Sequence, residues 1–140
     1  MDQRVKEFFA LYEKANSVSD VSGIGALYAD TFMFGGPHGT QVVRREDFLK
    51  VVPRMKAHFT SIGLVQTRFQ VMETVILDPK YLLAKVACRL KFHSSSRNND
   101  LDAFATYVLA QGNKDALSII VQIDHQDLAS AIKEQQNAQP

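Results

Sequence analysis

The sequence predicts a single α+β domain, with helices first and a curved antiparallel sheet after them. The first part of the chain repeats apolar residues at helical spacing, and the second part holds long segments rich in Val, Ile, Phe, Tyr and Thr. Short connections separate these segments, which favours antiparallel pairing of neighbours. With 140 residues, of which 46% are hydrophobic and 22% charged, the chain suits one packed domain. We place this domain at 1–134 and expect the polar tail, 135–140, to fray.

Two helices are expected near the N-terminus. The first has one buried face, which is formed by Val5, Phe8, Phe9 and Tyr12. Asp20 can cap a second, short helix, in which Ile24, Leu27 and Tyr28 share a face. Each of these helices would then bury one side and expose the other.

A third helix is expected after two short strands. The strands 31–34 and 40–43 flank the segment 35–39, which is so rich in glycine and proline that it must be a loop. The helix that follows is expected to gather on one face the apolar residues Phe48, Val51, Val52, Met55 and Phe59. Pro53 lies inside this helix and removes one amide donor, so we expect a kink or a break there.

Four long strands are expected in the second half of the chain. They are the segments 64–77, 81–92, 101–111 and 117–125. Polar turns separate consecutive strands, so each strand is expected to pair with the next one. A short closing helix is expected from Asp127 through Ile132.

The alternation of side chains indicates which faces of the strands are buried. In 81–92 the even positions are apolar, while Arg89 and Lys91 lie on the other face. In 101–111, however, Phe104 and Tyr107 point to opposite faces. Apolar residues on both faces imply a second contact surface, and we predict a homodimer through the sheet.

Composition and charge exclude several classes of protein. The 16 basic and 15 acidic residues give a net charge of +1, so the long-range attraction expected of a nucleic-acid or membrane-surface binder is missing. The single cysteine, Cys88, excludes an intrachain disulfide and a multi-cysteine zinc site. We see no signal peptide and no apolar run of roughly 20 residues, so a cytoplasmic protein is the default expectation.

A short phrase and the order of the elements then indicate a family. Leu27-Tyr28-Ala29-Asp30 precedes the first short strand, and Arg45-Glu46-Asp47-Phe48 opens the third helix before four long strands. In these respects the chain resembles the NTF2-like superfamily, in particular its SnoaL-like and ketosteroid-isomerase-like members. The resemblance implies a cone in which a bent sheet wraps around helices and leaves a pocket at its open end. It commonly goes with a dimer, but it implies no particular reaction.

The comparison with ketosteroid isomerase argues against that activity. The reaction needs a carboxylate base, together with a tyrosine and a neutral aspartic acid that hydrogen-bond the developing oxyanion. The resemblance places the tyrosine on Tyr12, but it places the base on Gly36, just before Pro37. The strand 103–112, where the second acid is expected, holds no acidic residue. Ketosteroid isomerase activity is therefore not expected, and whether the protein is an enzyme stays open.

Four residues are candidates for catalysis: Tyr12, His38, His58 and Glu73. Glu73 shares its strand parity with Val71, so it would point into the cone as an acid or base. The alternative is that a β-bulge turns it outward, or that it pairs with Arg68 or Arg89. His38 would lie near the pocket mouth and His58 at the border of the core, where either is a general base or an ordinary polar side chain.

The expected ligand-binding residues are Tyr12, Tyr28, Phe32, Phe34, Met55, Phe59, Cys88 and Phe104. Alternatively, these residues belong to the hydrophobic core, because in such a cone the core ends where the pocket begins. We expect no metal site, since no histidines share short ligand spacing, and we infer no cofactor. Asp124 and His125 could form a polar pair at the rim, or Asp124 or Asp127 could cap the last helix.

Three functions remain open on the sequence. The preferred one is a SnoaL-like protein that binds a small hydrophobic molecule in a mostly apolar cone. The first alternative is a lyase or isomerase that acts on a hydrophobic carbonyl-type substrate by general acid/base catalysis. The second alternative is a dimerisation module without a ligand.

Overall fold

The computed structural model describes residues 2–18, 20–93 and 100–127. Within these ranges the elements follow the order predicted from the sequence, with a 3-10 turn (Asn113–Asp115) before the last strand. The helices are α1 (Gln3–Ser17), α2 (Val21–Gly25) and α3 (Arg45–Ser61). The strands are β1 (Tyr28–Gly36), β2 (Gly39–Arg44), β3 (Leu64–Asp78), β4 (Tyr81–Phe92), β5 (Asp100–Gln111) and β6 (Leu117–Asp124). The predicted closing helix and the tail lie outside the described residues, apart from Asp127.

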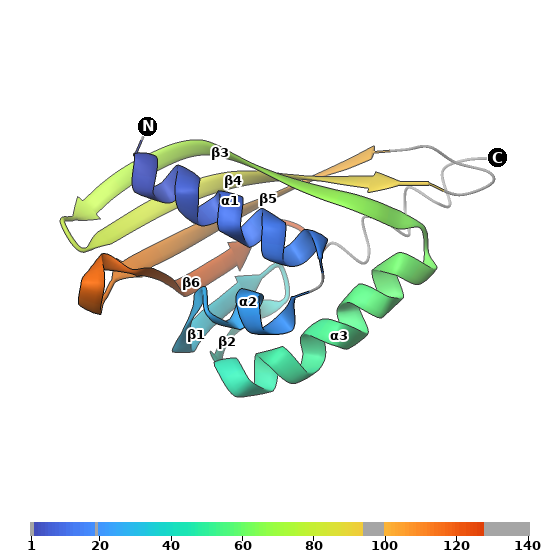
Figure 1. Ribbon diagram of the computed structural model, residues 1–140, viewed down its shortest axis with the longest axis horizontal. Coiled ribbons are helices and arrows are strands. Elements are labelled where there is room, and N and C mark those ends of the chain that lie inside the picture. Colours follow the sequence, from blue (N-terminus) through green and yellow to red (C-terminus); the bar gives the residue numbers. More distant parts are fainter. Residues whose placement is uncertain (1, 19, 94–99, 128–140) are drawn as a thin grey trace.

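The six strands form one open, curved sheet in the order β2-β1-β6-β5-β4-β3. The pairs of consecutive strands are antiparallel, as predicted, but β1 pairs with β6 in parallel. The parallel pair arises because the sheet brings the first and last strands together, with the rest of the domain as their connection. Figure 1 shows α1 lying across the sheet, with α2 and α3 on the same side of it.

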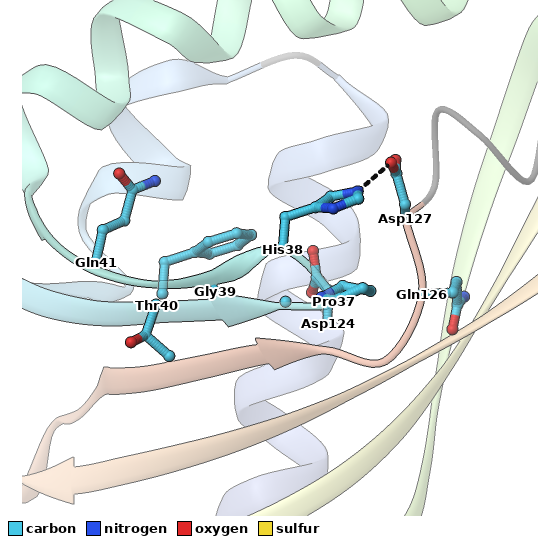
Figure 2. A pocket seen from close by; sticks show the side chains of 10 residues that line it. Pro37, His38, Gly39, Thr40, Gln41, Asp124, Gln126 and Asp127 are labelled. Atoms are coloured by element: carbon cyan, nitrogen blue, oxygen red, sulfur yellow. Dashed lines mark hydrogen bonds and ion pairs between the residues drawn. The ribbon is translucent and has the colours of Figure 1, made fainter.

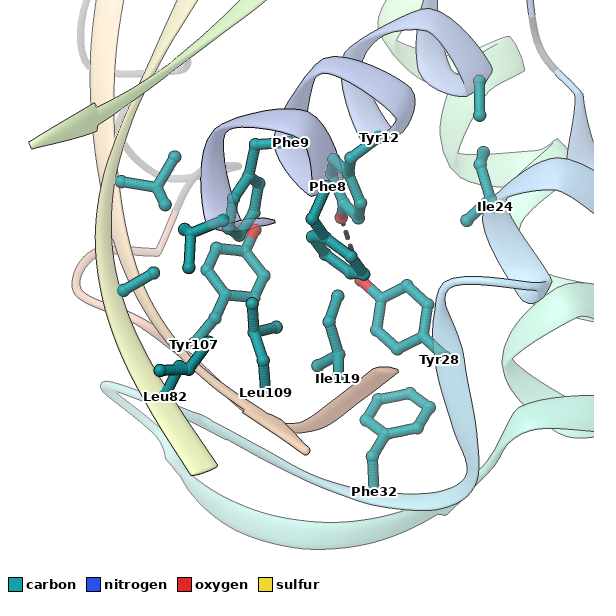
Figure 3. Packing of buried hydrophobic residues seen from close by; sticks show 14 of the residues in the cluster. Phe8, Phe9, Tyr12, Ile24, Tyr28, Phe32, Leu82, Tyr107, Leu109 and Ile119 are labelled. Carbon is teal, nitrogen blue, oxygen red and sulfur yellow. Dashed lines mark hydrogen bonds between the residues drawn. The ribbon is translucent and has the colours of Figure 1, made fainter. Parts of the chain in front are cut away.

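The core lies between α1 and the concave face of the sheet. Asp2 caps α1 by accepting a hydrogen bond from the backbone N–H of Arg4 at 2.9 Å. The predicted face of α1 is buried, and Phe9 meets the ring of Tyr107 at a centroid distance of 5.0 Å (Figure 3). Leu82, Leu109 and Ile119 of the sheet are fully buried beneath it. The middle of the cone is thus filled by side chains.

The third helix is unbroken, and it buries a different set of residues from the one predicted. It runs without a break through Pro53, although that residue supplies no amide donor. Its inward stripe also differs, because Val51 and Met55 are 45% and 42% exposed while Val52 is buried. Lys56, four residues after Val52, is half-buried on the same stripe. The apolar residues of this helix are too many for one face, so periodicity alone could not select the buried ones.

Strand β4 follows its predicted alternation, but β3 does not. The β3–β4 register shifts between Val71 and Glu73, so a β-bulge lies there and reverses the parity of the residues that follow. Glu73 pairs in register with Lys85 on the outer face of the sheet. The expectation that Glu73 points into the cone is therefore wrong, and its stated alternative, a β-bulge that turns Glu73 outward, is confirmed.

No helix in the described ranges is long and apolar enough to cross a bilayer.

Candidate functional site

A cavity of about 380 Å³ lies where the β1–β2 loop faces the end of β6 (Figure 2). Its walls come from both chain segments and include Phe34, Pro37, His38, Gln41, Asp124 and Asp127. Phe34 and Pro37 supply apolar surface, whereas the two aspartates and the histidine supply polar groups. No lysine or arginine is found among the described residues that line the cavity.

Asp124 is the half-buried acid of this cavity. It ends β6 on the concave side of the sheet, opposite Ala105 of β5. Gln122 donates a hydrogen bond from its Nε2 to the Asp124 carboxylate at 3.1 Å. Burial nevertheless raises the pKa of Asp124 above that of an ordinary aspartate, because desolvation disfavours the charged form more than this hydrogen bond favours it. Asp124 is therefore a candidate proton donor.

A hydrogen-bond chain joins Asp124 to the core. The Tyr28 hydroxyl donates to Oε1 of Gln122 at 2.6 Å. That hydroxyl has only one proton, so it accepts the hydrogen bond of 2.8 Å that joins it to the Tyr12 hydroxyl (Figure 3). Burial raises the pKa values of both tyrosines, which keeps them protonated as donors. The Tyr12 and Tyr28 hydroxyls thus hold the Gln122 side chain, and Gln122 in turn holds the Asp124 carboxyl group in place.

His38 and Asp127 form one edge of the cavity. His38 Nε2 lies 2.8 Å from Oδ2 of Asp127, and the contact joins two loops that are 89 residues apart in sequence (Figure 2). The His38 side chain is 80% exposed, while that of Asp127 is 31% exposed. The imidazole is thus accessible to a ligand and oriented by a carboxylate, an arrangement that suits proton transfer.

The structure does not bring the four predicted catalytic residues together. His38 lines the cavity, and Tyr12 reaches it only through Tyr28 and Gln122. His58 is exposed near the end of α3, with its ring 5.8 Å from that of Phe59. Glu73 is ion-paired with Lys85 at 3.3 Å, rather than with Arg68 or Arg89. His58 and Glu73 therefore lie outside this site.

The predicted ligand-binding residues are also spread over the molecule. Phe34 lines the cavity. Tyr12, Tyr28 and Phe32 belong to the buried core, whereas Phe59 and Cys88 pack in a second apolar cluster around Leu90 and Phe92. Met55 and Phe104 are exposed. Burial raises the pKa of the Cys88 thiol to about 12, which makes it a poor nucleophile.

Sequence reasoning missed Asp124 as the acid of the cavity. The sequence suggests for Asp124 a rim pair with His125 or a helix cap, but His125 Nε2 lies 2.7 Å from the Thr106 hydroxyl. The available signal was the pair of polar residues Gln122 and Asp124, two positions apart at the end of an apolar strand. The predicted role of Asp127 as a helix cap concerns residues outside the described ranges.

Across residues 2–18, 20–93 and 100–127, no three acidic, histidine or cysteine side chains are grouped so that they could hold a metal ion.

Comparison with known proteins defines the fold. No protein-family model matches the sequence, and no curated protein matches it. Among solved structures, an NTF2-like protein of unknown function from Shewanella oneidensis aligns with a TM-score of 0.73 at 13% identity, over 88% of this chain and 97% of the other. A ketosteroid isomerase-like protein from Erwinia carotovora aligns with a TM-score of 0.61 at 12% identity, over 86% and 91% of the two chains.

A third similar structure holds a ligand. It is a protein from Catenulispora acidiphila in complex with S-DNPA, which aligns with a TM-score of 0.70 at 12% identity, over 92% of this chain and 95% of the other. Identities this low establish the fold and nothing further. The chain is accordingly an α+β protein with the NTF2-like cone fold, as the resemblance implied.

Proposed function

We propose that the protein binds a small hydrophobic molecule with a carbonyl-type oxygen in the cavity lined by Phe34 and Asp124. The observation that supports this most directly is a partly buried carboxyl group with a raised pKa on the wall of a concave site. A protonated carboxyl donates a hydrogen bond, and a carbonyl oxygen accepts one. Phe34 and Pro37 would contact the apolar part of the ligand.

The charge of the cavity narrows the class of ligand. Asp127 faces it, and no lysine or arginine is among the described residues that line it. An anionic ligand would meet the Asp127 carboxylate, with no lysine or arginine in the described part of the lining to neutralise it. We therefore expect neutral carbonyl compounds to bind better than carboxylic acids of the same size.

Two substitutions of Asp124 test the proposal. A thermal-shift screen with neutral hydrophobic ketones and aldehydes should give ligands that stabilise the unmodified protein. Asp124→Asn keeps a hydrogen-bond donor and should retain such binding, whereas Asp124→Leu should weaken it about tenfold or more. Glu73→Gln removes an exposed acid outside the cavity and serves as the control. If Asp124→Leu binds the same ligands equally well, the proposed site is wrong.

A second candidate function is proton transfer on such a ligand, as in a lyase or isomerase. It is favoured by the presence of Asp124 and the His38–Asp127 pair on the same cavity. In this proposal Asp124 exchanges a proton with the ligand oxygen while His38 removes one from the neighbouring carbon. The test is deuterium incorporation beside the carbonyl of a bound ketone, followed by NMR. Asp124→Asn and His38→Gln should each abolish the exchange without abolishing binding; exchange that persists in both variants would exclude this role.

Self-association through the outer face of the sheet is a third candidate. One apolar row crosses all six strands in register, and it consists of Val42, Met33, Val121, Val108, Leu83 and Val75. At a strand spacing of about 4.8 Å, such a row is roughly 25–30 Å long, which suits an interface of ordinary size. The ion pairs Glu73–Lys85 and Arg89–Asp102 lie on the same face.

Light scattering tests the dimer. We expect the unmodified protein to have the mass of two chains and Leu83→Asp to have the mass of one. Lys50→Gln, an exposed change on α3, away from the outer face of the sheet, is the control. A monomeric unmodified protein would refute self-association. A dimer that binds no ketone would instead favour the ligand-free module.

A further inference from the structure

A second cavity, remote from Asp124, lies between α2 and α3. It has a volume of about 570 Å³ and is lined by Val21, Pro53, Lys56, Ala57, Thr60 and Ser61. Lys56 is the only charged residue among them, and the lining surface is mostly apolar. We propose that this groove binds an amphipathic carboxylate, with the carboxylate on the Lys56 ammonium and the hydrocarbon chain on Val21, Pro53 and Ala57.

The position of Lys56 on α3 is the first argument. Lys56 follows Val52 by one helical turn and so lies on the inward-facing stripe, where an apolar residue is the usual occupant. Its Nζ donates a hydrogen bond to the backbone carbonyl of Asn16, in the last turn of α1. The aliphatic part of the Lys56 side chain and the backbone carbonyl at the C-terminal end of α1 therefore hold this half-buried ammonium at the groove.

The missing counter-charge is the second argument. Among the described residues, no carboxylate forms an ion pair with Lys56; those carboxylates that are ion-paired are paired with other cations. A carbonyl oxygen carries only a partial negative charge, so desolvation lowers the pKa of Lys56 without compensation from an acid. An incoming anion would supply the missing charge and form a charge-assisted hydrogen bond.

The polar groups around Lys56 favour a carboxylate over a phosphate. A phosphate dianion generally needs several cationic or backbone donors, whereas the described lining of the groove offers one lysine. The Ser61 hydroxyl already donates to the carbonyl of His58 at 2.6 Å. One lysine beside an apolar groove thus suits one negative charge on a hydrocarbon chain.

Binding of decanoate and decanol, measured by NMR titration of the Val21 and Ala57 methyl groups, tests the proposal. The two ligands share a hydrocarbon chain and differ in charge. We expect decanoate to bind at least about tenfold more tightly than decanol, since a hydrogen bond to a charged group exceeds a neutral one by roughly that factor. Equal binding of the two ligands, or no binding of decanoate, would overturn the proposal.

Substitutions test whether Lys56 causes the preference for decanoate over decanol. Lys56→Met places an apolar side chain on the inward stripe and should remove the preference for decanoate, whereas Lys56→Arg should retain it. Lys50→Met removes an exposed lysine from the same helix and should change nothing. Asp124→Leu should also leave decanoate binding unchanged, which separates this site from the Asp124 cavity. Unchanged decanoate affinity in a folded Lys56→Met protein would show that Lys56 is not the anion site.

Discussion

The hydroxyl groups of Tyr12 and Tyr28 lie 2.8 Å apart in the core, although the residues are 16 positions apart in the chain. Tyr12 comes from the middle of α1 and Tyr28 from the first residue of β1. Their contact continues through Gln122 to Asp124 at the cavity. The polar chain therefore links the packing of the core to the position of the acid.

Tyr28→Phe should destabilise the protein by about 1–3 kcal/mol, because it leaves the Tyr12 hydroxyl and the Gln122 carbonyl without their shared partner. The aromatic packing on Phe32 and Phe48 is retained. Urea unfolding followed by circular dichroism measures the change. Tyr81→Phe, at an exposed tyrosine, should change the free energy of unfolding by less than about 0.5 kcal/mol. Equal effects of the two substitutions would contradict the hydrogen-bond chain.

Asp124→Asn should stabilise the protein at neutral pH. The pKa of Asp124 is raised in the folded state, so between the ordinary aspartate pKa of 3.8 and the folded value the folded protein holds a proton that the unfolded chain has lost. Stability of the unmodified protein therefore falls as pH rises through that window. Asp124→Asn has no carboxyl group at this position and therefore lacks this loss of stability. Its free energy of unfolding, measured with urea, should exceed that of the unmodified protein at pH 7, and the difference should vanish below the ordinary aspartate pKa of 3.8. A variant less stable than the unmodified protein at pH 7 would indicate an ionised, stabilising Asp124.

Cys88 should resist alkylation in the folded protein. With a pKa of about 12, the thiol is ionised at pH 8 to only about one part in ten thousand, against a substantial fraction for an ordinary thiol. Iodoacetamide labelling, followed by mass spectrometry, should therefore be at least about a thousandfold slower than in urea-unfolded protein. Comparable rates in the two states would show that the second apolar cluster is open around Cys88.

Gly63→Ala should cost more than about 1 kcal/mol of stability, because two effects act at this turn between α3 and β3. The backbone has φ 102°, a region that favours glycine, and an added Cβ would lie 2.9 Å from the His93 carbonyl oxygen. Gly39→Ala is the matched control, since φ is 128° there but an added Cβ meets nothing within 4 Å. Thermal unfolding should show the larger loss for Gly63→Ala. A loss at Gly39 of the same size would mean that the backbone conformation alone accounts for the effect.

The Asp124 cavity shows which features a local sequence pattern can predict and which it cannot. The resemblance placed the loop that holds His38 near a pocket mouth, and His38 lines the cavity beside the end of β6. For Glu73 the strand parity predicted an inward position and a β-bulge was the alternative; the bulge between Val71 and Glu73 decides for the outward position. The pairing of His38 with Asp127 joins segments far apart in sequence, and periodicity contains no information about such contacts.

By itself the sequence determined the order of helices and strands, the buried face of α1 and the alternation of β4, because each depends on spacing within one element. Only the tertiary structure decided that β1 pairs in parallel with β6, that Asp124 lines a cavity and that Lys56 faces inward. Those features depend on strand register and on how helices rest on a bent sheet. They are fixed by contacts between distant segments, which no local pattern specifies.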